Sequence, residues 1–214
     1  MIELIPEDWE TWSLIRPLAE RAWNHLEIGT VLDNLCLIAD DLTADEHPWI
    51  VFDAPRRALL YCHPDHFHDD PTAGHGMMPA VLPWEIRAVP EVEQQGDFCS
   101  AASDRFLHHH LLALADLAGG VVKPGEVPAR SAESYQEAWS VTLDGRLRRR
   151  FLPGLPTAER RRRFFRAFTV GGVLLPHHWD VFHRLWDLDD VTHTELLNLA
   201  DRLPGGENRH TGED

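Results

Sequence analysis

Three consecutive histidines, His108, His109 and His110, lie in the leucine- and alanine-rich segment 103–120. The apolar spacing of this segment predicts a helix that ends at its closing glycine pair. Imidazole nitrogens are common ligands of zinc and other divalent transition metals. The segment therefore poses the question of which histidine can reach a protected metal site.

The helical wheel separates the three histidines. Successive residues lie about 100° apart around a helix, so Asp104 and His108 share one border of the leucine-rich core face. Their four-residue spacing brings the two side chains together. His109 falls with Arg105 on the opposite side, where we expect it to be solvated. The pair of Asp104 and His108 suits a divalent metal, and it equally suits a hydrogen bond without metal.

A second group of potential ligands is the segment CHPDHFHDD, residues 62–70. His66 and His68 have the i, i+2 spacing of ligands on an extended segment, and His63 lies close by. Metal-binding loops have this composition, and so do exposed polar loops of acidic proteins. No Cys-x-x-Cys pair anchors the segment. We keep these three histidines as a second candidate metal site, with a polar loop as the alternative.

Short β-branched and aromatic runs predict a sheet of three or four short strands within residues 48–90. WIVFD and RALLYC predict a hairpin over 49–53 and 57–62, and WEIRAV predicts a strand over 84–89. The rest of the chain predicts helices. These elements set the frame in which the histidines must lie.

Helices are predicted on both sides of this sheet. Within 7–42, apolar spacing predicts one helix from residue 18 to 41. Within 98–203, capping patterns such as Thr192–Glu195 predict several helices.

The order of helices, small sheet and helices predicts the fold class. It favours one mainly helical α+β domain over residues 1–204, not an alternating α/β fold. We expect a flexible tail over residues 205–214.

This order of elements resembles that of the zincin-like metallopeptidases, with WEIRAV before the histidine helix. In that family the helix carries His-Glu-x-x-His, and a Glu on a later helix often completes the zinc site. His108 matches the first His of this motif. His109 stands in place of the general-base Glu, and Leu112 stands in place of the second His. The resemblance covers roughly residues 49–150.

The resemblance implies a zincin-like arrangement that binds zinc or another divalent metal. Asp104, His108 and Glu137 are then the expected metal residues, with Glu133 as the alternative to Glu137. The missing Glu base indicates a degenerate metal-dependent hydrolase, because the family's water activation depends on it. The alternative is a non-catalytic binding protein whose His-rich loop and acidic surface bind a partner or a metal.

Charge and composition narrow the classes of partner. The formal net charge of −15 disfavours binding to nucleic acid and to anionic membranes. Three widely spaced cysteines, Cys36, Cys62 and Cys99, predict free thiols and a cytoplasmic protein. Nine arginines lie between Arg146 and Arg166. They predict either solvated helix ends or a site for an acidic partner.

Overall fold

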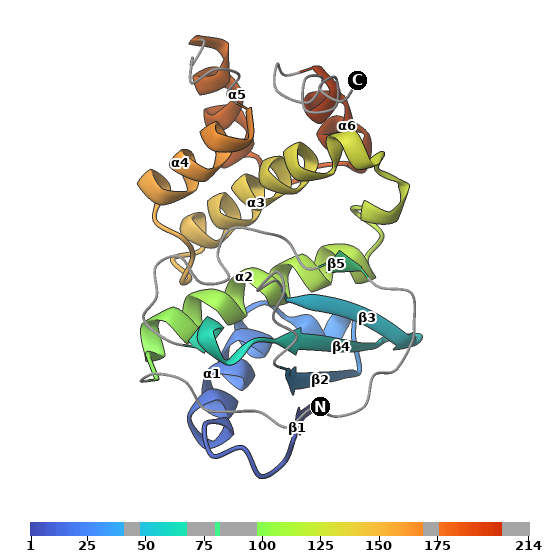
Figure 1. Cartoon of the computed structure of the whole chain (residues 1–214), viewed down its shortest axis with the longest axis vertical. Helices are drawn as coiled ribbons and strands as arrows, with labels where there is room; N and C mark the ends of the chain where they lie inside the picture. Colours follow the sequence, from blue (N-terminus) through green and yellow to red (C-terminus); the bar gives the residue numbers. More distant parts are fainter. Residues whose placement is uncertain (41–47, 68–79, 82–97, 169–175, 203–214) are drawn as a thin grey trace, which may run out of the picture. The chain divides into compact units, whose positions relative to one another are not determined.

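The structure, a computed structural model, describes residues 1–40, 48–67, 80–81, 98–168 and 176–202 (Figure 1). His68, the predicted strand over 84–89 and the predicted tail over 205–214 lie outside these ranges.

The chain divides into two compact units, Met1–Gly119 and Gly120–Asp214. The division falls at the glycine pair that was predicted to end the histidine helix. A single domain over residues 1–204 stays a prediction.

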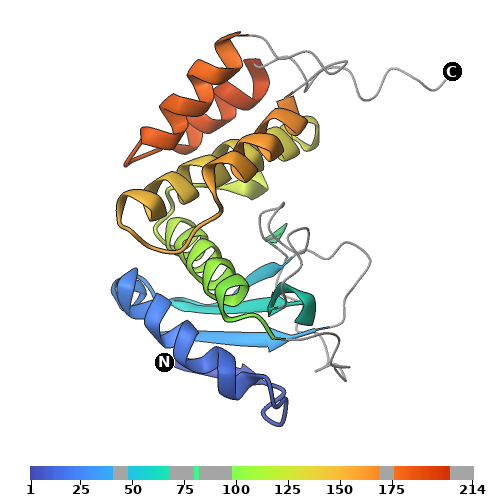
Figure 2. The ribbon, with the colours of Figure 1, turned by 90° about the vertical axis from the view of Figure 1, so that its left-hand side faces the viewer.

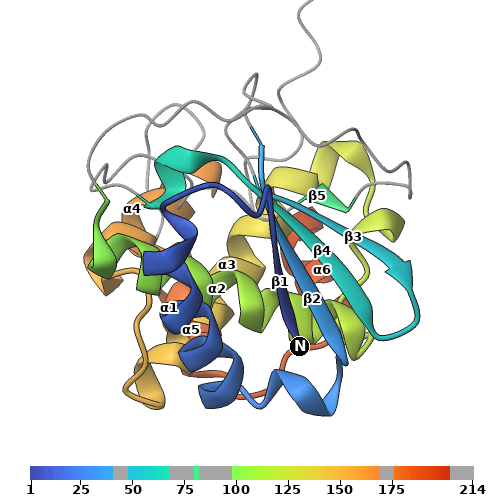
Figure 3. The same cartoon turned by 90° about the horizontal axis from the view of Figure 1, so that it is seen from below.

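The first unit combines a small mixed sheet with two long helices, α1 and α2. The order of its main elements is β1 (Ile2–Ile5), α1 (Trp12–His25), β2 (Asn34–Ala39), β3 (Trp49–Ala54), β4 (Arg57–Cys62), β5 (Ala80–Val81) and α2 (Ser100–Ala118). In the part of the chain that the structure describes, the strands form one sheet of order β1-β2-β4-β3-β5. Figure 3 shows β1, β2, β4 and β3 fanning out in this order.

The strands β1 and β2 differ from the predicted helical N-terminus. They pair in parallel, and α1 is the crossover between them. The predicted helix over 18–41 is therefore wrong, since α1 ends at His25 and residues Asn34–Ala39 form a strand. The run Leu35–Ala39 is buried throughout, as expected for a strand covered on both faces. Such a continuous apolar run has no period of two to distinguish it from a helix.

The predicted hairpin is confirmed. β3 and β4 pair antiparallel and are joined by a tight turn in which Arg56 has a φ of 62°. On its other side β4 pairs in parallel with β2, which makes the sheet mixed. With the helices of both units the chain is mainly helical, and the α+β class is confirmed.

The second unit is a group of helices around α3. They are α3 (Ala132–Arg149), α4 (Thr157–Phe168), α5 (Pro176–Asp187) and α6 (His193–Arg202), and α3 contacts each of the other three. The predicted capping box is present before α6, where the Thr192 backbone N–H donates to Glu195 Oε2 at 2.9 Å. Over the described residues, no helix combines the length and apolar character that crossing a bilayer requires.

Candidate functional site

The helix α2 carries all three histidines, and all three are buried. Every residue from Phe106 to Leu114 is buried, so α2 does not have a single core face. The prediction that His109 is solvated is therefore wrong, because only 7% of it is exposed. His108 is completely buried. The wheel placed His109 outside because it assumed a single apolar stripe.

The imidazole of His108 is fixed by its own helix. Its Nδ1 lies 2.9 Å from the backbone carbonyl of Asp104 and 3.1 Å from carboxylate oxygen Oδ1 of the same residue. Since both partners are acceptors, Nδ1 must carry the proton. Burial lowers the pKa of His108 and outweighs the opposing effect of Asp104. The ring is therefore neutral at pH 7, and the lone pair of Nε2 is available.

The second ring of the site comes from α1. His25 is the last residue of α1, and its Nδ1 lies 3.3 Å from His108 Nε2. The two ring centroids are 5.6 Å apart. α1 and α2 lie side by side, as Figures 1 and 2 both show. His25 is exposed while His108 is buried, so the pair of nitrogens connects the interior of the first unit to solvent.

Asp104 also links the two helices. Its Oδ2 lies 2.7 Å from a guanidinium nitrogen of Arg21, one turn before His25 on α1. Arg21, Asp104, His108 and His25 thus form a continuous chain of polar contacts between α1 and α2. The helical spacing correctly predicted the contact of Asp104 with His108. His25 lies 83 residues from His108 in sequence, and no local pattern pointed to it.

The second candidate site is a short turn whose ring nitrogens are already used. The backbone N–H of His63 donates to His66 Nδ1 at 3.1 Å, and the backbone N–H of Asp65 donates to His63 Nδ1 at 3.2 Å. Nδ1 of each ring is thus engaged within the turn, and a carboxylate oxygen of Asp65 also lies 3.3 Å from His63 Nδ1. The His66 ring is buried and stacks on Phe106 with 4.7 Å between centroids. These contacts favour a structural role for both residues.

Glu137, the third residue of the predicted metal set, belongs to the second unit. Its Oε2 accepts a 3.3 Å hydrogen bond from Arg160, and Arg160 also donates to Asp144. Burial raises the pKa of Glu137, and the neighbouring Arg160 opposes this shift. All three side chains are buried. Metal binding by Glu137 would have to break this ion pair.

The arginine-rich region has several intramolecular partners. Arg149 donates to the backbone carbonyls of Trp186 and Leu188 and lies 2.9 Å from Asp189. Further along, Arg162 and Arg163 both pair with Glu159, and Arg161 lies over the ring of Trp179. With Arg160, five of the nine arginines are engaged within the second unit. An acidic partner at Arg146–Arg166 stays a prediction.

Among the described residues, no group of three or more His, Cys, Asp or Glu side chains is arranged to hold a metal. The candidate site is therefore the pair of imidazoles alone, with Asp104 behind one of them. Comparison with protein-family models, curated proteins and solved structures gives no match for this chain.

Proposed function

We propose that the chain binds a divalent transition metal such as zinc between His25 Nδ1 and His108 Nε2. The observation that carries this proposal is their separation of 3.3 Å. Two nitrogens, each about 2.0–2.1 Å from a tetrahedral zinc ion, lie roughly 3.3–3.4 Å apart. The exposed His25 ring can turn toward an ion held by His108 Nε2, because it is not packed in the core.

The surroundings of the pair support the same proposal. The hydrogen bond from His108 Nδ1 to the backbone carbonyl of Asp104 holds the buried ring with Nε2 outward, as acceptors behind metal-ligating histidines do, and the Asp104 carboxylate lies close by. His25 ends α1, where the free carbonyls of the helix favour a cation. The positive charge of Arg21 acts against a cation, but its ion pair with Asp104 offsets part of this effect. In the metal-free protein the same two nitrogens share one proton in a hydrogen bond.

Two protein nitrogens leave two positions of a tetrahedral ion for water. Metal-bound water is the usual nucleophile of metal-dependent hydrolases, so the pair is compatible with that class. The chain has His109 in the position of the zincin-like Glu base, and His109 is buried. A hydrolase of the zincin-like architecture would therefore need a general base other than His109.

The proposal is tested by titrating the untagged protein with zinc in competition with a chromophoric chelator. We expect one equivalent to bind, and His25→Ala to abolish binding. His25→Ala is the cleanest variant because this side chain is exposed and its loss leaves the core intact. Asp104→Asn should weaken zinc binding about 10- to 100-fold, which is the usual effect of replacing a residue that supports a metal-ligating histidine. Cobalt(II) adds an independent readout through the visible absorption of the bound ion.

The matched control is His183→Ala, which removes an exposed histidine of the second unit. It should leave zinc stoichiometry and affinity unchanged. The buried ligand is tested with His108→Gln, whose folding is checked by circular dichroism. Unchanged zinc binding in both His25→Ala and folded His108→Gln would overturn the proposed site. If the parent protein binds no zinc, the metal-binding proposal is wrong and the contact of His25 with His108 is only a hydrogen bond.

A further inference from the structure

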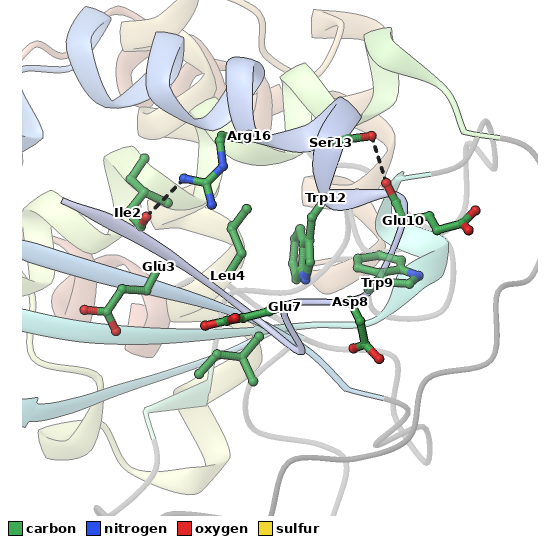
Figure 4. Close-up of a pocket in the computed structure, with 11 residues that line it drawn as sticks. Ile2, Glu3, Leu4, Glu7, Asp8, Trp9, Glu10, Trp12, Ser13 and Arg16 are labelled. Carbon is green, nitrogen blue, oxygen red and sulfur yellow. Dashed lines mark hydrogen bonds between the residues drawn. The ribbon is translucent and has the colours of Figure 1, made fainter.

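A cavity of about 660 Å³ lies between β1 and the first turns of α1 (Figure 4). Four carboxylates contribute to its lining, and Arg16 is the one basic residue among the lining residues. The carboxylates belong to Glu3, Glu7, Asp8 and Glu10. Figure 4 shows Glu7 and Asp8 on the loop that connects β1 to α1. The cavity is thus acidic, and a cationic ligand matches it.

One wall of the cavity is the outer edge of the sheet. Within the described residues, β1 is the last strand on its side. The backbone N–H of Leu35 in β2 donates to the carbonyl of Met1 at 2.9 Å. Because parallel strands alternate their hydrogen bonds, Ile2 and Leu4 turn their backbone groups away from β2. The carbonyl of Ile2 accepts a 3.4 Å hydrogen bond from Arg16, drawn as a dashed line in Figure 4.

The opposite wall contains a buried donor with no partner. Trp12 is only 3% exposed, and its Nε1 has no hydrogen-bond partner among the described residues. Figure 4 shows its ring between β1 and α1, with the nitrogen turned toward the loop of Glu7. The Nε1 of Trp9 likewise has no partner there. A buried N–H left unpaired is costly, so these indoles indicate that an acceptor belongs in the cavity.

We propose that an extended basic peptide of a partner protein binds this cavity by adding a strand along β1. The backbone N–H and C=O groups of such a peptide can pair with those of Ile2 and Leu4 that face away from β2. Its carbonyl oxygens can accept a hydrogen bond from the indole N–H of Trp12. Its lysine or arginine side chains meet the carboxylates of Glu7, Asp8 and Glu10, whereas Glu3 already pairs with Arg57 at 3.3 Å. A free polyamine would supply the cations but no acceptor for the indole. The observations therefore favour a peptide.

The test is fluorescence anisotropy with a labelled peptide of about eight residues that alternates lysine and valine, a length typical of a strand. We expect saturable binding by the full chain. An acidic peptide of the same pattern should not bind. The decisive comparison is the lysine–valine peptide with every second backbone nitrogen methylated. It keeps all charges but cannot pair along one edge, so its affinity should fall at least about tenfold.

Three variants locate the site on the chain. Glu7→Gln combined with Asp8→Asn should weaken binding about three- to tenfold, as expected for exposed ion pairs. Arg16→Ala should strengthen binding, because it frees the Ile2 carbonyl and removes the basic residue of the cavity. Glu126→Gln, an exposed carboxylate of the second unit, is the control and should change nothing.

Three results would overturn the proposal. The first is equal affinity for the methylated and unmethylated peptides, since this would leave only attraction between charges. The second is displacement of the peptide by spermidine at similar concentration, which would indicate a site for free organic cations. The third is unchanged affinity in both the Glu7/Asp8 variant and Arg16→Ala, which would place any peptide elsewhere.

Discussion

Arg160 Nε donates a 2.6 Å hydrogen bond to Asp144 Oδ2, and each residue is 1% exposed. Removing one partner of a buried ion pair leaves an uncompensated charge. We expect Arg160→Ala to lower the free energy of unfolding by about 3–5 kcal/mol, measured by urea denaturation. Arg162→Ala is the control, because Arg162 is exposed on the same helix and should cost at most about 1 kcal/mol. Equal effects of the two variants would contradict the prediction.

Gly145 is required by the close approach of α3 to the end of α5. A Cβ at this position would lie 2.1 Å from the backbone carbonyl oxygen of Trp186. Gly145→Ala should therefore destabilise the protein by about 1–3 kcal/mol, although alanine is the better helix former by about 1 kcal/mol. Gly125→Ala, where a Cβ meets nothing within 4 Å, is the matched control. A more stable Gly145→Ala variant in thermal unfolding would show that the contact is absent.

The three cysteines should differ in reactivity although all are free. Burial raises the pKa of the Cys36 thiol to about 11 and that of Cys62 well above its ordinary value. Thiolate is the reactive form, so both should resist a disulfide reagent at about pH 8 in the native protein. Cys99 is partly exposed and should react first. Three thiols should react in denaturant without reductant, and a lower number would indicate a disulfide.

The capping box of α6 should give the second unit a pH-dependent contribution. Hydrogen bonds from Thr192 hold the pKa of Glu195 below its ordinary value of 4.5. Because the folded-state pKa is the lower one, the stabilisation is present above pH 4.5 and is lost as the pH falls through the folded-state value. Glu195→Ala should cost about 0.5 kcal/mol at pH 7 and less at about pH 3.

The measurement for this prediction is chemical unfolding of both proteins at the two pH values. Thr194→Ala changes the neighbouring exposed position and controls for helix propensity. A cost of Glu195→Ala that stays constant between pH 7 and pH 3 would show that the carboxylate does not act as the cap.

The sequence predicted those elements whose signals are local. The hairpin 49–62 consists of two short β-branched or aromatic runs joined by turn residues, and Thr192–Glu195 is a capping box within four residues. β2 was mistaken for a helix because its buried run lacks alternation and continues the helical spacing of the apolar residues before it. β1 was missed because its pairing with β2 depends on residues more than thirty positions away.

The candidate site shows the same division between local and distant signals. The contact of Asp104 with His108 follows from helical spacing alone. The role of His25 depends on how α1 packs against α2, and a single sequence carries no signal for that packing. Glu137 was assigned through a family resemblance, whereas in the second unit it contacts Arg160.

The first unit can complete its packing only late in translation, after its last helix, α2, has been synthesised. α1 packs against α2, and the contact of His25 with His108 joins positions 83 residues apart. The ribosome must therefore release residues up to the end of α2 before this unit can close. Until then the nascent β1, α1 and β2 lack their covering helix, which leaves apolar surface open to chaperones. A translational pause before α2 has left the ribosome would prolong this exposure, whereas a pause after its release would allow the first unit to close.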